Sequence, residues 1–259
     1  MTAASPSAAT GRPDLQHHTV QFFGDAEPAL ARNVGVYLAG GLEAGESAIV
    51  IALRENRSAI RAVLHERGLD VGALVADGRL EMLDAAETLA ALTFDGLPDR
   101  DRFADIVESR VRRAPRVRAY GEMVGLLWGR GERAAAVALE GLWNELHATT
   151  PGLALFCGYP IDVFGDAFGP GHLDELLCAH THVVSSYDDG ALCRAIERAM
   201  DEILAGSSAE MRRLMKPNHR PAWGSIPRGE TLVLWLRNNL PDAAGPILAR
   251  AKTYCCAAA

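Results

Sequence analysis

The segment His18-Thr19-Val20-Gln21-Phe22-Phe23-Gly24-Asp25 decides how the fold of this 259-residue chain is interpreted. Residues 19–23 form a predicted strand, and apolar residues then recur at helical spacing from Leu30 to Leu42. In an α/β fold, ligands bind at the carboxyl ends of parallel strands, where a phosphate-binding loop is expected. This junction contains a single glycine, Gly24, and no lysine. We therefore predict a binding site at this place, but no nucleotide hydrolysis.

Apolar strands and helical segments alternate along the rest of the chain. A continuous apolar run such as Ala48-Ile49-Val50-Ile51-Ala52 is typical of a strand that is buried on both faces. Alternation of this kind favours an α/β fold with a three-layer, mainly parallel sheet. The further predicted strands are residues 80–84, 117–120, 153–157 and 182–185.

Composition divides the chain into four predicted parts. Residues 1–16 are rich in small and polar residues and are interpreted as a disordered tail. Residues 17–205 form the predicted α/β domain, 206–228 a linker, and 229–259 a small C-terminal helical pair that Pro241 divides. Because each of these two helices is too short to be stable alone in water, we expect the pair to dock on the main domain or on a partner.

Charge and cysteine content argue against several classes of protein. A formal net charge of −7 repels phosphate backbones and anionic membranes, so we expect neither nucleic-acid nor membrane binding. No apolar run reaches the length of about 18 residues that a membrane span needs. The N-terminus lacks the apolar core of a signal peptide, so we expect a cytoplasmic protein. The five cysteines are odd in number and show no CxxC spacing, which argues against a disulfide framework and a zinc knuckle.

Several catalytic and DNA-binding motifs are absent from the sequence. There is no GxxxxGK[ST] motif and no lysine before Lys216, which argues against a P-loop ATPase. There is no GxSxG elbow of a hydrolase and no GxGxxG after the first strand. No helix-turn-helix with a basic recognition helix is evident. These absences favour a protein that is not an enzyme.

The ends of the predicted strands carry residues that could line a ligand pocket. The carboxyl ends of parallel strands converge on one crevice, so we expect the side chains after the first, fourth and fifth strands to meet there. A pocket of aromatic rings and sulfur with one carboxylate and one imidazole suits a small, mostly apolar ligand held by few polar contacts. The predicted ligand-binding residues are His18, Phe22, Phe23, Glu122, Trp128, Cys157 and Tyr159.

Most of these residues also have a structural interpretation. Phe22, Phe23 and Trp128 follow strand or helix patterns that are common in packed cores. His18 is equally well explained as a hydrogen-bonded structural histidine. Burial of an unpaired carboxylate costs several kcal/mol, so Glu122 should either face solvent in the crevice or pair with His18 or an arginine.

A metal site is one further interpretation of the same region. His18, Glu122 and Cys157, together with His180 or His182, offer ligand atoms, but nothing in their local spacing imposes such a site. Cys157 is equally consistent with a small buried apolar residue, since no basic neighbour is evident to lower the pKa of its thiol. We therefore expect no metal and no cofactor.

Five motifs, taken in order, resemble the MEDS domain, which is named for methanogens, methylotrophs and the repressor of dichloromethane dehalogenase. The resemblance covers roughly residues 17–185, and it is the order and spacing of the motifs that is specific. The motifs are H-x-x-x-F-[FY] at 18–23, G-L-E-A-G-E at 41–46, G-E-M with a tryptophan at 121–128, W-N-E-L at 143–146 and C-x-Y-P at 157–160.

The resemblance implies a RecA/KaiC-like α/β fold without a working phosphate loop that senses small hydrocarbon derivatives. We find neither a DNA-binding domain nor a kinase core in the sequence, so we expect the signal to pass to a separate kinase or transcription regulator. A homodimer is compatible with this interpretation. Two alternatives remain open: a scaffold that binds proteins but no small ligand, and a hydrolase in which Glu122 acts as base and His18 orients it.

Overall fold

The computed structural model describes residues 17–24, 29–171, 173–204, 213 and 226–257. The predicted tail and nearly all of the predicted linker lie outside these described residues. The predicted boundaries of the four parts therefore stay predictions.

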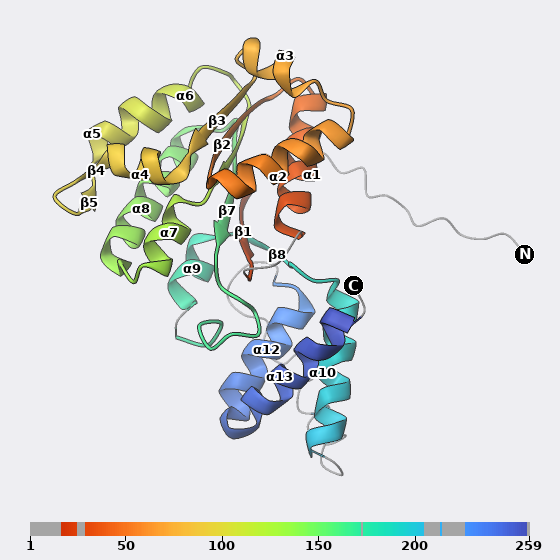
Figure 1. Ribbon diagram of the computed structural model, residues 1–259. Coiled ribbons are helices and arrows are strands. Elements are labelled where there is room, and N and C mark those ends of the chain that lie inside the picture. The colour runs from red at the N-terminus through yellow and green to blue at the C-terminus, as the bar shows by residue number, and fades with distance from the viewer. Residues whose placement is uncertain (1–16, 25–28, 172, 205–212, 214–225, 258–259) are drawn as a thin grey trace, which may run out of the picture.

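A six-stranded, wholly parallel sheet lies at the centre of the structure (Figure 1). The strand order is β3-β2-β6-β7-β1-β8, so the first strand of the chain pairs with β7 on one side and β8 on the other. The predicted α/β class and parallel sheet are confirmed. The strands are β1 (His18–Phe22), β2 (Ser47–Ala52), β3 (Leu80–Asp84), β6 (Val117–Gly121), β7 (Leu153–Tyr159) and β8 (His182–Val184).

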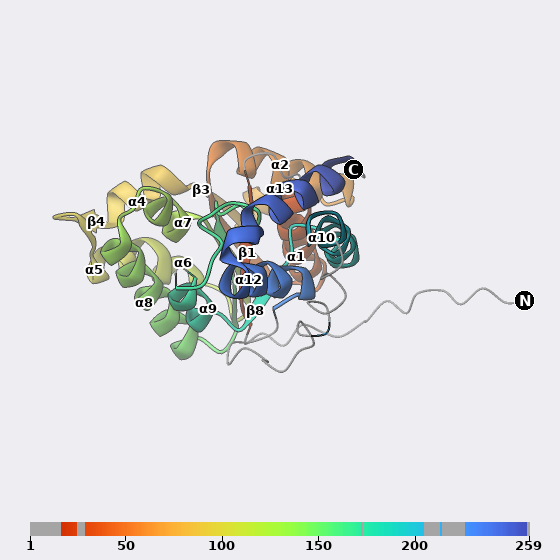
Figure 2. The ribbon, with the colours of Figure 1, turned by 90° about the horizontal axis from the view of Figure 1, so that it is seen from below.

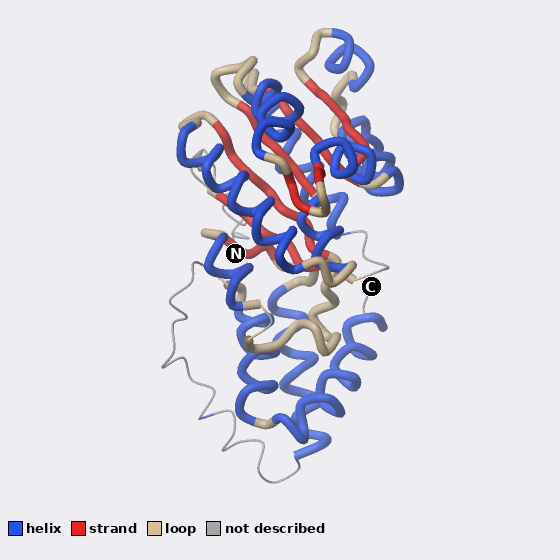
Figure 3. The backbone as a smooth tube through the Cα atoms, turned by 90° about the vertical axis from the view of Figure 1, so that its left-hand side faces the viewer, coloured by secondary structure: helices blue, strands red, loops and turns tan. Residues whose placement is uncertain are grey.

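Helices cover both faces of this sheet, as Figures 1 and 3 show. One face carries α1 (Ala29–Glu43), α2 (Arg54–Glu66) and α3 (Val71–Ala76). The other carries α4 (Ala85–Leu92), α7 (Met123–Gly129) and α8 (Arg133–Thr149). On this second side also lie the hairpin β4 (Thr93–Phe94) and β5 (Leu97–Pro98), the segments α5 (Arg100–Phe103), η1 (Ala104–Glu108) and α6 (Ser109–Val111), and α9 (Asp174–Ala179).

Alternation along the strands divides the core into two apolar layers. On β2, Ile49 and Ile51 belong to the layer under α4 and α7, whereas Val50 packs under α1 and α2. The same alternation on β1 places Val20 and Phe22 in the layer under α4 and α7. His18 is two residues before Val20 and four before Phe22, so its side chain points to the same face of the sheet, the face that α8 covers.

Three helices at the C-terminal end pack against one another: α10 (Asp189–Leu204), α12 (Arg228–Asn239) and α13 (Pro241–Ala257). Figure 3 shows them grouped beyond one end of the sheet, and Figure 2, seen from below, shows them in front of it. Gly229 allows the close approach of α12 to α10, because a Cβ there would lie 2.5 Å from Leu192 Cδ2. Pro241 is the first residue of α13, a position that tolerates its missing N–H. None of the described helices is long and apolar enough to cross a membrane.

The G-L-E-A-G-E motif forms a buried ion pair at the end of α1. Glu46 Oε2 accepts a hydrogen bond of 2.7 Å from Arg118 Nε on β6, and Glu46 Oε1 lies 2.9 Å from Arg116. Gly41 makes room for this pair, because a Cβ there would lie 2.6 Å from Arg118 Cδ. Gly45 adopts a φ of +82°, which strongly favours glycine. The motif thus fixes α1 against the centre of the sheet.

Candidate functional site

His18 is the first residue of β1, so it lies at the amino end of that strand. The prediction that it lies in one crevice with Glu122 is wrong. Its side chain is buried, with Nδ1 3.0 Å from Asn144 Oδ1 of α8 and Nε2 3.2 Å from Cys157 Sγ of β7. The contact with β7 follows from the parallel register, in which His18 is opposite Leu155 and Val20 is opposite Cys157.

Glu140 of α8 lies against the same histidine. Its Oε1 atom is 3.4 Å from His18 Nε2 and 3.6 Å from His180 Nε2. Its Oε2 atom accepts a hydrogen bond of 2.9 Å from the hydroxyl of Tyr159. This glutamate therefore joins residues from α8, β1, β7 and the segment that follows α9.

His180 completes the group from the other side. Its Nδ1 atom lies 2.6 Å from the carbonyl oxygen of Leu176, one turn earlier in the chain. Its ring centroid is 4.1 Å from that of His18. Together, ligand atoms of His18, Glu140, Cys157 and His180 lie within 4.8 Å of one another, and all four residues are buried.

Burial dominates the electrostatics of this group, which we call the four-residue cluster. Burial raises the pKa of Glu140 to about 7 and raises the pKa of the Cys157 thiol well above its usual value. Burial lowers the pKa of His180 to about 4, and it lowers the pKa of His18 with help from nearby His180 and His147. Both cluster imidazoles are therefore neutral near pH 7.

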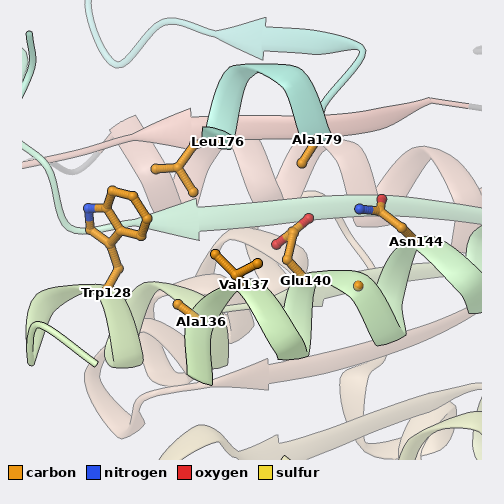
Figure 4. Close-up of a pocket in the computed structure, with 8 residues that line it drawn as sticks. Trp128, Ala136, Val137, Glu140, Asn144, Leu176 and Ala179 are labelled. Carbon is orange, nitrogen blue, oxygen red and sulfur yellow. The ribbon is translucent and has the colours of Figure 1, made fainter. Parts of the chain in front are cut away.

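A hollow of about 360 Å³ opens beside the cluster (Figure 4). Its floor is α8, and Leu176 and Ala179 of α9 lie opposite (Figure 4). Glu140 and Asn144 are its polar side chains, and both also contact His18. The remaining lining residues are Trp128, Ala136, Val137 and Gly141.

Glu122 lies in a different environment, at the carboxyl end of β6. Its carboxylate accepts hydrogen bonds of 2.7 Å from the backbone N–H of Leu53, from Asn56 Nδ2 and from the Tyr120 hydroxyl. The prediction that it faces solvent or pairs with His18 or an arginine is therefore wrong. Burial raises the pKa of this carboxyl group, and the three donors oppose the shift. The hydrogen bonds from Leu53 and Asn56 hold the start of α2 to the sheet.

Replacement of Glu122 by glutamine is expected to lower the free energy of unfolding by about 1–3 kcal/mol, because the new amide N–H₂ faces a buried donor. Denaturant unfolding of the Glu122→Gln variant measures this loss. Glu55→Gln is the matched control, since Glu55 is exposed and lies close to Glu122. A loss no larger than that of the control would contradict the role assigned to these hydrogen bonds.

The predicted aromatic residues separate into two groups. Tyr159 is buried in contact with Glu140, and Trp128 lines the hollow with its ring centroid 6.2 Å from that of Tyr159. Phe22 packs in the core, 5.4 Å between ring centroids from Phe168. Phe23 belongs to the apolar layer on the opposite face of the sheet. The structure thus groups His18, Cys157, Tyr159 and Trp128, but not Phe23 or Glu122.

Sequence reasoning missed Glu140, and it did not include Asn144 among the predicted ligand-binding residues. A signal was present, because Glu140 and Asn144 are four residues apart and lie on one helix face with the apolar Ala136. A carboxylate on the buried face of a helix is unusual in a soluble protein and indicates a buried partner. His182 lies apart from the cluster, where its ring packs against His17.

The structure is a parallel α/β domain in which a buried polar cluster lies beside a mostly apolar hollow. Comparison with known protein families matches residues 17–181 to the MEDS domain, described as the methanogen/methylotroph, DcmR sensory domain. The chain therefore belongs to the MEDS family, as the sequence motifs predict, and its role is signal input. The helices α10, α12 and α13 lie outside the matched segment. No curated protein matches the chain.

Proposed function

We propose that the hollow between α8 and α9 binds a small, mostly apolar molecule and that this binding is the signal input. The observation that carries this proposal is the lining, in which Trp128, Val137 and Leu176 supply apolar contact and Glu140 supplies a carboxyl group. A volume of about 360 Å³ is in the usual range for small-molecule sites. The carboxyl group would fix the orientation of a ligand that carries one polar atom.

The signal would leave the site through α9. This helix contributes Leu176 and Ala179 to the hollow, and the short strand β8 connects it to α10. A ligand that prefers one position of α9 would shift the population of two arrangements of the C-terminal helices. A separate kinase or transcription regulator would detect this shift. In this proposal the domain is a non-enzymatic, cytoplasmic sensor on a RecA/KaiC-like scaffold.

Gly141 allows a sharp test of the hollow. It lies on α8 and lines the hollow, and a Cβ built there meets no atom within 4 Å. The Gly141→Leu variant is therefore expected to fold, to be at least as stable as the parent protein, and to lose ligand binding. Gly245→Leu is the matched control, because Gly245 also lies in a helix with open space around its Cβ, outside the hollow.

The measurement is thermal stabilisation by a panel of short-chain alcohols, ketones, thioethers and small aromatic hydrocarbons. Stabilisation of the parent and of Gly245→Leu, with none for Gly141→Leu, is the expected result. Equal stabilisation of all three proteins would show that the ligand binds elsewhere. No stabilisation by any compound, with strong stabilisation by ATP, would overturn the proposal.

A further inference from the structure

The two histidines of the four-residue cluster direct unprotonated nitrogens toward its centre. His180 Nδ1 faces the carbonyl oxygen of Leu176, so this nitrogen carries the proton and Nε2 keeps a lone pair. His18 Nδ1 faces the amide oxygen of Asn144, so the same assignment holds for His18 Nε2. Histidines that bind metals usually donate their second N–H to a carbonyl or carboxylate oxygen in this way.

The remaining inward atoms are also electron-pair donors. Glu140 Oε1 and His180 Nε2 are buried, lie 3.6 Å apart and have no hydrogen-bond partner among the described residues. A thiol proton on Cys157 could serve His18 Nε2. Glu140 Oε1 and His180 Nε2 are 3.6 Å apart, too far for a hydrogen bond even when the raised pKa of Glu140 leaves its carboxyl group protonated. Unpaired buried polar atoms are costly, so such an arrangement indicates a missing positive partner.

Three distances within the cluster fit a single ion, and all four ligand atoms lie within 4.8 Å of one another. Bonds of about 2.0–2.3 Å from a tetrahedral ion to nitrogen, oxygen and sulfur place its ligand atoms about 3.3–3.8 Å apart. His18 Nε2 lies 3.2 Å from Cys157 Sγ and 3.4 Å from Glu140 Oε1, and Glu140 Oε1 lies 3.6 Å from His180 Nε2.

From this geometry we propose that His18, Glu140, Cys157 and His180 bind one divalent transition-metal ion of the zinc type. A thiolate and a carboxylate balance the charge of a divalent ion, and two neutral imidazoles complete a tetrahedral set of two nitrogens, one oxygen and one sulfur. The site replaces the expectation of no metal. It keeps three of the residues considered from the sequence, His18, Cys157 and His180, and Glu140 takes the place of Glu122.

The metal site adds to the proposed signal input without depending on it. Glu140 is both a metal ligand and a lining residue of the hollow. A molecule in the hollow would therefore contact the carboxylate that holds the ion. The ion itself requires only the four buried side chains, so metal binding persists even where no small molecule binds.

The test uses the full chain without an affinity tag, stripped with a chelator and titrated with Zn²⁺ or Co²⁺. Uptake of one ion per chain is expected, and Co²⁺ should give the strong near-ultraviolet absorption of a cobalt–thiolate bond. The Cys157→Ala variant should lose this absorption. Cys193→Ala should keep it, because Cys193 is an equally buried free cysteine outside the cluster.

A second pair of variants tests the histidine ligands. His180→Gln should bind Zn²⁺ more weakly, whereas His182→Gln should bind like the parent, since His182 lies outside the cluster. Asn144→Leu, which removes the hydrogen bond that orients His18, should weaken binding about 10- to 100-fold.

Two results would overturn the metal proposal. One is a folded parent protein that takes up no stoichiometric Zn²⁺ or Co²⁺, a result that needs no variant to fold. The other is unchanged cobalt–thiolate absorption in folded Cys157→Ala, with folding checked by circular dichroism. The Gly141→Leu variant separates this proposal from the signal-input proposal, because it should lose ligand binding and retain the metal.

Discussion

Replacement of Glu46 by methionine is expected to lower the free energy of unfolding by about 3–5 kcal/mol, the usual cost of breaking a buried ion pair from one side. The side chains of Glu46 and Arg118 are 4% and 7% exposed, and a hydrogen bond of 2.7 Å joins them. Without Glu46, the guanidinium of Arg118 keeps the carbonyl oxygen of Tyr37 as an acceptor, but no carboxylate. Denaturant unfolding of Glu46→Met measures the loss.

Two further variants identify the cause of that loss. Glu43→Met is the matched control, because Glu43 and its partner Arg67 are 47% and 40% exposed and 3.7 Å apart. Removal of this surface pair should change stability by less than about 1 kcal/mol. The double variant Glu46→Met with Arg118→Met should recover part of the stability, since it leaves no unpaired buried charge; Arg116, the other partner of Glu46, is 47% exposed. Equal losses for Glu46→Met and Glu43→Met would contradict the importance of the buried pair.

The strands were predictable because their signals are local. Ala48 to Ala52 is a continuous apolar run, and the structure places β2 in the interior of the sheet. Leu153 to Cys157 gave the same signal, and β7 continues to Tyr159, with every residue buried. Such runs can be read without knowledge of the partner strand. The order of the strands has no comparable local signal.

The candidate site could be predicted only in part because it depends on that order. His18 and Cys157 are 139 residues apart, and they meet because β1 pairs with β7 in one particular register. The sequence prediction assumed that all candidate residues gather at the carboxyl ends of the strands. Glu122 does lie at such an end, but the cluster begins at the amino end of β1 with His18. Glu140 enters through the packing of α8, which the sequence alone does not determine.

Some of the MEDS motifs contain structural residues, and others contain residues of the candidate site. In G-L-E-A-G-E, Gly41 and Glu46 serve the buried pair with Arg118, and neither belongs to the four-residue cluster. In C-x-Y-P, Cys157 belongs to the cluster and Tyr159 donates a hydrogen bond to Glu140. A motif in one family can therefore preserve either the fold or the site, and the contacts of each residue distinguish the two.

The second large effect is expected on removal of the metal. An ion that binds the folded chain alone stabilises it by RT ln(1 + [L]/Kd), which is about 4 kcal/mol at a free concentration of 1,000 times Kd. The ion also removes the unfavourable contact between Glu140 Oε1 and His180 Nε2, two buried atoms without a hydrogen-bond partner among the described residues. Excess chelator should therefore lower the melting temperature of the parent protein, and added Zn²⁺ should restore it.

Cysteine variants decide whether this stabilisation comes from the cluster. Cys157→Ala should melt at the same temperature with chelator and with Zn²⁺, whereas Cys193→Ala should respond like the parent. Zn²⁺ bound to scattered surface groups would instead stabilise all three proteins alike. A Zn²⁺ response that survives in Cys157→Ala would place the ion outside the cluster. If the stabilisation by Zn²⁺ depends on Cys157, the ion is bound by the cluster. It would then link β1, β7 and α8 through its bonds to His18, Cys157 and Glu140, directly beside the hollow proposed to receive the signal.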